Sequence, residues 1–577
     1  MKNRILLILL LFAGITIFNS CDENKLLNKH PLDAPNAGNF FINATSARQA
    51  AGSVLGIMTQ IPWDFRRYWW TRMDIFSDDS YTRNVADRTP GLQWTADATW
   101  YGYYSWWYCF YKGINNANFA IDGIPTSTDL TFTPDKQAPY IAVAKMEKAF
   151  CFLQLTNFWG DVPYSEHFVS VVDSMFASRT AKADVMTHVI ADLQYATTNL
   201  PHSWSGGDQG FPTKAAAAAM LAKAYLYNRD FANAATAAAA ALAIADADGY
   251  AMMSDYTYMM SYDSQTAGAN TEFIWYFPFI ENGSATGTQN EMNVERLVRD
   301  SPGPVGAIYG AGWGYALPSQ NLYNEFEPGD PRRVQSMYAP GDFYAIYNGD
   351  QVPADNTFVI PNNKPATGQP APAFLYPADS TYTIGSKIYY RALWSYSNTN
   401  TRKMVEHDYK DGVLLEIDEQ QAGYDVPLVR YADLVLMYAE ALIESNQVAL
   451  GIAQINRVRA RPSTHMPPIS AGLSQNDARK ALRHERRIEL NMEGLRLADM
   501  FRWTRDDGQS GTVPGTTPGS YLEQIFGSGL NGKPILMRLG DPTQLKGQAL
   551  TFPKHLLFPI PQDEVDRNKN MKQNPGW

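Results

Sequence analysis

Cysteine and histidine are scarce in this sequence, which has 3 cysteines and 8 histidines among 577 residues. Three cysteines are too few for the disulfide framework that stabilises many secreted domains. The histidines show none of the spacings of known metal sites, so we expect neither a metal nor a cofactor. Positive charge is also limited, because 48 Lys and Arg stand against 58 Asp and Glu. Nucleic-acid binding needs a basic surface, and we do not expect that function.

Long apolar runs are missing apart from one at the N-terminus. Lys2 and Arg4 precede the apolar segment 5–17, which is too short to cross about 30 Å of hydrocarbon as a helix. This arrangement is typical of a secretory signal, and we predict that residues 1–20 form a signal peptide. Cys21 comes directly after Ser20 at the end of this segment, as in a bacterial lipobox. An ordinary cleaved signal followed by an incidental cysteine is the alternative.

In a lipobox, the cysteine thiol is diacylated and the cysteine becomes the new N-terminus. We therefore predict lipidation of Cys21 and a tether over residues 21–40. A body without spanning segments is then anchored to a membrane rather than inserted in it. Cys109 and Cys151 would remain in apolar, aromatic surroundings, either joined in an oxidising envelope or as two buried thiols.

The pattern of the remaining chain predicts a mainly α fold. Two alanine-rich segments, 213–226 and 232–244, flank a polar break at 228–230. They predict a helical hairpin that looks like one tetratricopeptide unit. A second hairpin is predicted from an apolar stripe that begins at about 427, a break at Asn446 and a following apolar segment. We expect a tetratricopeptide-like body of such helical hairpins.

Helical periodicity mostly fails between residues 251 and 425, where Gly, Pro, Asn, Asp, Ser and Tyr dominate. We interpret this stretch as a large irregular loop region on one face of the helical body, where binding surfaces tend to lie. The expected organisation is a helical region over 41–250, the loop region over 251–425 and a second helical region over 426–577.

Catalytic motifs are absent from the sequence. No Gly-x-Ser-x-Gly elbow occurs, and His484-Glu485 lacks the second histidine of a zinc protease motif. We predict no catalytic residue and no enzymatic activity. The alternative of a glycosidase with a pair of catalytic carboxylates stays open, because such pairs assemble from positions that are distant in sequence.

One predicted helix places carboxylates among apolar residues. It begins near Ser474, with Asp477 in the position of a capping box. Glu485 and Glu489 share its apolar stripe, and carboxylates there are costly unless they are paired. An active-site acid would explain them, but we favour structural ion pairs. The candidate partners are nearby arginines: Arg486, Arg487, Arg496 and Arg502.

Aromatic residues make up 13% of the chain, and seven of the 14 tryptophans lie between Trp63 and Trp107. Aromatic rings stack on the C–H faces of sugars, while polar side chains bind the hydroxyls. We therefore expect ligand contacts in polar loops, from Asp79, Arg83, Asn84, Trp94, Trp313 and Tyr315. Another group of aromatic residues has helical spacing, and we expect most of it in the core: Tyr104, Trp107, Tyr108 and Tyr111.

Several short segments occur in a distinctive order. Arg-Tyr-Ala-Asp at 430–433 and Glu-Arg-Arg-Ile-Glu-Leu at 485–490 are the most specific. Others lie at 26–33, 111–118, 148–163, 212–215, 330–333 and 558–576. Together they resemble the SusD/RagB family of outer-membrane nutrient-binding lipoproteins, and the acidic Asp22-Glu23 resembles the surface-export signal of Bacteroidetes lipoproteins. His484 departs from the family pattern, where an acidic residue is usual, and Trp577 stands where Tyr is common.

This resemblance implies a helical body with an irregular ligand-binding face and no catalysis. It also implies a partner, a SusC-like TonB-dependent β-barrel on which the lipoprotein acts as a hinged lid. We expect a lipoprotein on the exterior of the outer membrane that binds oligosaccharide and passes it to this transporter. The alternatives are a lipid-anchored glycosidase, a peptide-binding member of the family and a scaffold that binds proteins.

The lipid anchor can be tested directly. Cys21→Ser removes the thiol that would be acylated, so the variant should leave the membrane fraction of the cell. Cys109→Ser keeps the lipobox and should stay with the membranes. Unchanged fractionation of Cys21→Ser would show that the cysteine is incidental.

Overall fold

The computed structural model describes most of the chain from residue 40 onward. The described residues are 40–60, 65–82, 89–170, 176–260, 264–265, 268–279, 316–338, 343–345, 381–384, 387–391, 400–401, 409–410, 413–414, 425–509, 511–526, 536–538, 541–545 and 550–577. None of the helices within these ranges is long and apolar enough to cross a lipid bilayer.

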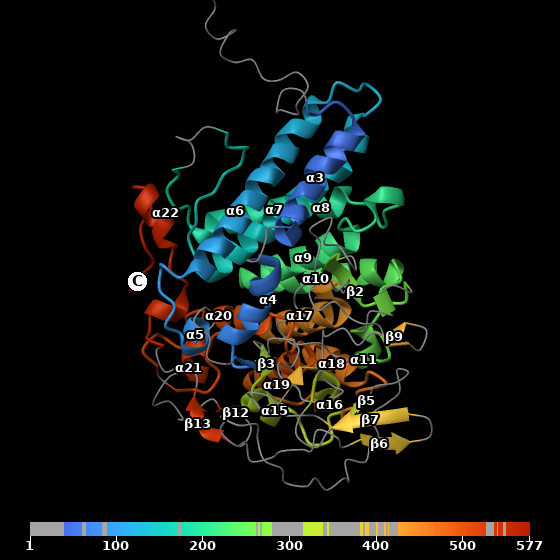
Figure 1. The fold of residues 1–577 in the computed structure, drawn as a ribbon, viewed down its shortest axis with the longest axis vertical. Helices are drawn as coiled ribbons and strands as arrows, with labels where there is room; N and C mark the ends of the chain where they lie inside the picture. Colours follow the sequence, from blue (N-terminus) through green and yellow to red (C-terminus); the bar gives the residue numbers. More distant parts are fainter. Residues whose placement is uncertain are drawn as a thin grey trace, which may run out of the picture.

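The fold is mainly α, as the sequence predicts, and its long helices stack in the order of the chain (Figure 1). Each of α6 to α9 packs against the helix that follows it, α10 packs on α17, and α17 packs on both α18 and α19. This is the arrangement of tetratricopeptide-like hairpins. The long helices are α3 (Ala44–Gln60), α4 (Phe65–Phe76), α6 (Tyr101–Gly123), α7 (Pro134–Trp159), α8 (Lys182–Asn199), α9 (Lys214–Tyr227), α10 (Phe231–Ala247), α17 (Tyr431–Glu444), α18 (Val448–Arg459) and α19 (Gln475–Glu489).

Local sequence explains where these helices begin. Thr213 caps α9 by accepting a hydrogen bond from the amide of Ala216, and Asp230 caps α10 in the same way. Arg229, in the turn between them, has a φ of 61°. The buried face of this hairpin is mostly alanine, so the two helices can approach closely. Ser474 caps α19 by accepting a hydrogen bond from the amide of Asp477 at 3.1 Å, which is one half of a capping box, and its hydroxyl donates to the Asp477 carboxylate at 2.7 Å.

Short helices and strands make up the rest of the described secondary structure. In Figure 1, many of them lie at the end of the molecule away from α3. The short helices are α5 (Thr89–Gln93), α11 (Tyr256–Met259), α15 (Gln320–Glu325), α16 (Arg332–Ser336), α20 (Arg496–Arg502), α21 (Ser520–Phe526) and α22 (Gln562–Arg567). The strands are β1 (Ser80–Tyr81), β2 (Phe273–Phe277), β3 (Leu317–Pro318), β4 (Met337–Tyr338), β5 (Phe343–Ala345), β6 (Thr381–Ile384), β7 (Lys387–Arg391), β8 (Asn400–Thr401), β9 (Tyr409–Lys410), β10 (Val413–Leu414), β11 (Val426–Arg430), β12 (Leu536–Arg538) and β13 (Asp541–Leu545).

The start of the second predicted hairpin is corrected by the structure. The apolar residues from Val426 to Arg430 form strand β11, which pairs antiparallel with β2, and α17 begins only at Tyr431. A fully buried strand has no polar face, so its sequence looks like the continuation of a buried helix.

Apolar side chains of α4, α6, α7 and the C-terminal segment form one large core. Trp69 packs edge-on against Trp106 and Phe110 with ring centroids 5.1 and 4.9 Å apart. Cys109 and Cys151 are both buried here as free thiols, which settles the alternatives left open by the sequence. Burial raises the pKa of the Cys151 thiol, so this group is uncharged.

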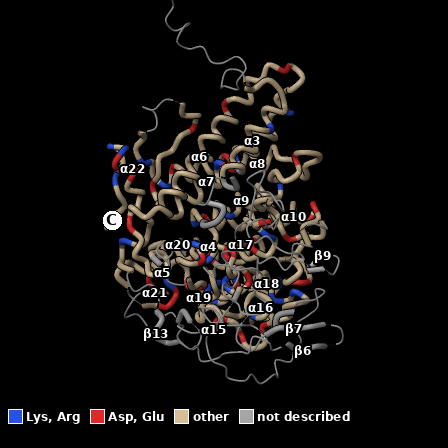
Figure 2. The backbone as a smooth tube through the Cα atoms, viewed as in Figure 1, with Lys and Arg blue, Asp and Glu red and all other residues tan. Residues whose placement is uncertain are grey.

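A second core is built of charged side chains around α19, where Figure 2 shows acidic and basic residues gathered. Glu485 and Glu489 are both 0% exposed. Arg332 Nη1 donates to both carboxylates, over 2.5 Å to Glu485 and 3.0 Å to Glu489. Arg430 and Arg461 donate to Glu489 Oε1 at 2.8 and 2.6 Å. Both glutamates are therefore buried and paired with arginine, as expected.

The partners of these two glutamates differ from the ones predicted. They come from β11, α16 and the end of α18 rather than from Arg486 and Arg496. Successive residues of a helix differ by about 100° in direction, so Arg486 points away from Glu485. Arg486 instead pairs with Asp499 at 3.0 Å, and Arg496 pairs with Asp78 at 2.8 Å. We call these ion pairs around α19 the arginine lattice: Arg332, Arg430, Arg459, Arg461, Arg486, Arg487, Arg496 and Arg502 with their buried carboxylates.

His484, the residue that departs from the family pattern, lies at the edge of the arginine lattice. Its Nδ1 is 2.9 Å from Glu325 Oε1, and its Nε2 is 3.3 Å from Glu327 Oε1. Burial alone lowers the pKa of His484, but the hydrogen bond and charge of Glu325 outweigh it and the pKa is raised. Burial raises the pKa of Glu325, yet Arg487 and His484 bring it down to about 2. His484 thus bridges α19 to the residues around the end of α15.

The arginine lattice predicts a large effect of Glu489→Ala. Removal of this carboxylate leaves buried arginines uncompensated, which should lower the free energy of unfolding by about 3–5 kcal/mol. Thermal melting measures the change. Asp563→Ala removes an exposed carboxylate that pairs with Arg567 at 3.5 Å, and it should leave the melting temperature nearly unchanged. Equal melting of Glu489→Ala and the wild type would show that the carboxylate is solvated.

The His484 bridge predicts a dependence of stability on pH. Because the folded-state pKa is raised, the stabilisation is complete below the unfolded pKa of about 6.5 and is lost as pH rises through the folded pKa. The difference in melting temperature between wild type and His484→Gln should therefore be largest near pH 5.5 and shrink at alkaline pH. A difference that grows with pH would contradict the bridge.

Candidate functional site

The candidate site is built on a short ladder between two strands that are far apart in sequence. β1 and β3 are antiparallel, with Ser80 opposite Pro318 and Tyr81 opposite Leu317. The chain therefore leaves β1 toward Arg83 at the same end of the ladder at which it enters β3 from Tyr315. The segment that follows β1 and the segment that precedes β3, both singled out by the sequence, are thus attached to the ladder at neighbouring points.

Hydrogen bonds on both sides of the ladder hold the two strands in register. Ser80 Oγ donates to the carbonyl of Leu317 at 3.1 Å. Ser319 donates through its amide to the carbonyl of Asp79 at 2.8 Å and through its hydroxyl to that of Asp78 at 2.7 Å. These residues are buried, so the base of the site is shielded from water and firmly placed.

Asp78 and Asp79 join this base to the arginine lattice. Arg496 Nε donates to Asp78 at 2.8 Å, and Arg487 Nε donates to Asp79 at 2.7 Å. Burial raises the pKa of Asp78, but the charges of the two arginines prevail and lower it. The pKa of Asp79 is raised, mainly by burial and also by the charge of Asp78, although Arg487 opposes the shift.

The prediction that Asp79 contacts the ligand is therefore wrong. Its side chain is 0% exposed and faces Arg487, so it cannot reach a sugar hydroxyl in this structure. The sequence placed it in a polar loop because its neighbours are polar. The arginine that draws it inward comes from α19, 408 residues later in the chain.

Trp94 is also a core residue rather than an exposed ring. Its side chain is 2% exposed and packs edge-on against Phe76 with centroids 5.1 Å apart. It also lies parallel to the ring of Phe501 and perpendicular to His555. The prediction failed because Trp94 lacks a partner within its own segment but finds partners in α4, α20 and the C-terminal part. A ligand contact for Trp94 is thus not supported.

Four of the expected ligand residues, and the expected lipidation site, lie outside the described residues: Arg83, Asn84, Trp313, Tyr315 and Cys21. The sequence also grouped the aromatic residues of α6 as core. Trp106 and Trp107 are buried, as expected, and Tyr104 and Tyr111 are partly buried. Tyr108, however, is 44% exposed, and the neighbouring Tyr101, which the sequence analysis did not single out, is 56% exposed.

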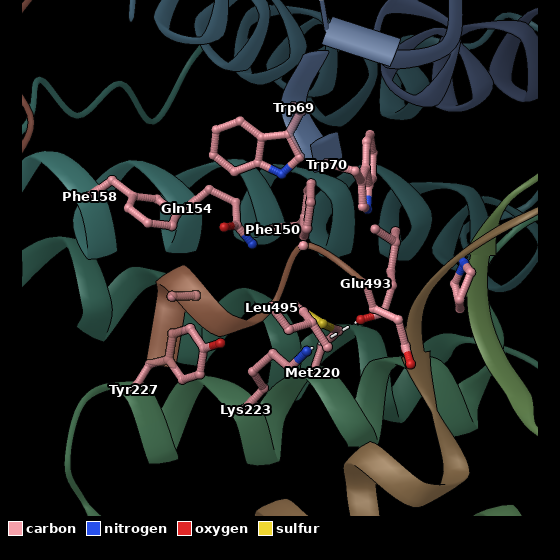
Figure 3. Close-up of a pocket in the computed structure, with 14 residues that line it drawn as sticks. Trp69, Trp70, Phe150, Gln154, Phe158, Met220, Lys223, Tyr227, Glu493 and Leu495 are labelled. Carbon is pink, nitrogen blue, oxygen red and sulfur yellow. Dashed lines mark hydrogen bonds between the residues drawn. The ribbon is translucent and has the colours of Figure 1, made fainter. Parts of the chain in front are cut away.

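A cavity within the helical body is too small to be the ligand site. It lies where α7 and α9 meet the segment after α19, and Trp69, Trp70, Phe150, Lys223 and Glu493 line it (Figure 3). Its volume of about 30 Å³ is enough for one or two water molecules but not for a sugar ring. Lys223 Nζ pairs with Asp433 at 3.0 Å and donates to the carbonyl of Leu428 at 3.3 Å.

Comparison with known proteins agrees with this fold. The sequence model of the SusD family matches residues 271–577. A second model, described as starch-binding and associating with the outer membrane, matches residues 69–226. SusD-like protein P2 of Formosa agariphila is 26% identical over 486 residues, which cover 82% of this chain and 80% of that protein.

Solved structures show the same fold at low sequence identity. A SusD-like carbohydrate-binding protein from Bacteroides fragilis superposes with a TM-score of 0.68 and 21% identity, covering 92% of this chain and 100% of that one. A laminarin-binding SusD-like protein superposes with a TM-score of 0.66 and 20% identity, covering 93% of this chain and 100% of that one. The SusD family match spans more than half of the chain and includes α19 with most of the arginine lattice, and the chain belongs to the SusD family.

Proposed function

We propose that this protein binds oligosaccharides at the exterior of the outer membrane, to which Cys21 anchors it, and delivers them to a SusC-like TonB-dependent transporter. Binding rather than catalysis is the function of the SusD-like relatives, one of which is described as carbohydrate-binding and another as laminarin-binding. The match to a starch-binding family that associates with the outer membrane supports the same ligand class and location.

The observation that carries the proposal is the register of β1 and β3. It pairs Tyr81 with Leu317, so the end of β1 that precedes Arg83 and Asn84 lies beside the start of β3 that follows Trp313 and Tyr315 in sequence. A binding site assembled from both would combine aromatic rings, which stack on the apolar faces of a sugar, with polar groups for its hydroxyls. Weak contacts at several points suit a protein that must also release its ligand to a transporter.

The arginine lattice supports this role by fixing the base of the proposed site. A site held by a rigid base loses little conformational entropy when ligand binds. Asp78 and Asp79 supply that rigidity, since both are buried and bound to arginines of α19 and α20. In this proposal they are positioning residues, whereas Trp313 and Tyr315 contact the ligand.

A glycosidase is less well supported than a binding protein. A glycosidase needs two carboxyl groups that face a substrate cleft, one of them protonated. The buried carboxylates of the described lattice face arginines instead, and Glu485 and Glu489 share the same guanidinium of Arg332. A peptide ligand would use the same aromatic loops, and a screen of glycans and peptides separates the two.

Trp313→Ala tests the site. Removal of one aromatic platform should weaken glycan binding by about 1–3 kcal/mol, by analogy with bases stacked on aromatic residues, and leave thermal melting unchanged. Affinity gel electrophoresis followed by calorimetry measures the binding. Trp94→Ala is the matched control, because loss of this buried ring should destabilise the fold by about 3–5 kcal/mol. Wild-type affinity in Trp313→Ala would place the ligand elsewhere.

A further inference from the structure

Three tyrosines form an exposed row along the first half of α6. Tyr101 and Tyr108 are 56% and 44% exposed, and Tyr104 between them is partly buried. Their spacing of three and four residues places them on one face of the helix. The ring centroids are 6.4 Å apart for Tyr101 and Tyr104 and 6.0 Å apart for Tyr104 and Tyr108. We call this row the tyrosine strip.

The rings of the tyrosine strip have similar orientations. Tyr104 and Tyr108 are nearly parallel, with 18° between their planes, and Tyr101 is tilted by 33° from Tyr104. The strip is therefore a regularly spaced row of similarly oriented rings, two of which are exposed on the outside of the protein.

The helix beneath the strip is firmly held. Trp107 is buried and packs against Tyr111 with centroids 4.8 Å apart. The hydroxyl of Tyr111 donates to the carbonyl of Pro163 at 2.8 Å, which ties this part of α6 to the segment after α7. A tyrosine has few rotatable bonds, so a ring on a fixed helix loses little entropy on binding. The strip is thus a pre-formed surface.

Exposed apolar surface of this kind marks a contact site rather than ordinary surface. Residues 101–111 of α6 include no charged residue, and Lys112 follows them with its ammonium 5.7 Å from the centre of the Tyr108 ring. A neutral strip favours an uncharged ligand over an acidic glycan. It also lacks the exposed aliphatic and arginine side chains that accompany aromatic residues in protein interfaces, since the exposed and partly buried positions from 101 to 111 are all tyrosine.

We propose that the tyrosine strip is a second carbohydrate-binding surface, on which a neutral polysaccharide chain lies along α6. A polysaccharide repeats one ring along its length, as the strip does, and each sugar ring offers an apolar face for a phenol ring and hydroxyls for its edge. The inference rests on the proposed glycan-binding function. The loop site takes short oligosaccharides, and the strip holds the part of a longer chain that extends beyond it.

Two sites on one polymer act by multivalency. If a chain held at the loop site is long enough to reach the strip, the strip meets it at high effective concentration, and the combined affinity then exceeds that of either site. The strip therefore affects retention of a polymer and has little effect on a short oligosaccharide, because a short ligand cannot engage both sites.

The test uses the purified, lipidated protein in detergent. Affinity gels that contain a soluble α-1,4-glucan, β-1,3-glucan, xylan or galactomannan identify the polymer that retains the wild type. Tyr104→Ala/Tyr108→Ala should then bind that polymer at least about 30-fold more weakly, as expected from the loss of stacking on two rings. Binding of a short oligosaccharide of the same linkage, measured by calorimetry, should change less than about twofold.

Two control variants separate stacking from other effects. Tyr104→Phe/Tyr108→Phe keeps the rings and should keep polymer retention, and a loss there would overturn the stacking role. Tyr258→Ala removes a 38% exposed ring on α11, far from α6 in Figure 1, and should bind like the wild type. An equal loss in Tyr258→Ala would overturn the assignment to the strip. Thermal melting checks that all variants are folded.

The outcomes distinguish the strip from the proposed function. If the wild type is retained by a polymer and Tyr104→Ala/Tyr108→Ala is retained equally, the strip does not bind glycan, and contact with a protein explains it. If polymer and oligosaccharide binding fall together, the strip is not a separate surface, and the inference is wrong. If no glycan binds the wild type, the proposed function itself fails, and the strip assignment fails with it.

Discussion

The arginine lattice around α19 is the interaction on which the rest of the structure depends. Through charges removed from water, it joins β11, α15, α17 and α20 to α19 or to Asp78 and Asp79 before β1, and Asp79 lies 408 residues from its partner Arg487 in sequence. A buried charge is costly unless it is compensated, so each of these elements is stable only where its partners are present. Several groups share partners, as Arg332 does between Glu485 and Glu489, which makes assembly of the lattice cooperative.

The sequence predicted the existence of the lattice but not its connections. Glu485 and Glu489 on an apolar stripe require compensation, and helical periodicity together with a cost for buried charge is enough to say so. The identity of the partners depends on tertiary structure. Arg430 and Arg461 reach Glu489 because β11 and the end of α18 come to the side of α19 that carries it, whereas the adjacent Arg486 points toward Asp433 and Asp499.

For aromatic residues too, the sequence predicts local structure but not which distant elements cover a side chain. The alanine-rich and amphipathic segments gave the helices correctly, with an error only where β11 precedes α17. Exposure of single rings was predicted less well: Trp94 is buried by residues from distant segments, while Tyr108 is exposed although it was expected in the core. Helical spacing tells which rings share a face, but burial of that face depends on which other elements cover it.

The shortness of the β1–β3 ladder has a consequence for how the family can diversify. Among the described residues, the position of these strands is set by Asp78, Asp79 and Ser319 rather than by long strands. Changes in sequence outside this charged framework leave its contacts intact, so we expect loops next to the ladder to accept substitution, insertion or deletion. Such a separation of framework from recognition lets one architecture acquire new ligands by changes confined to its loops.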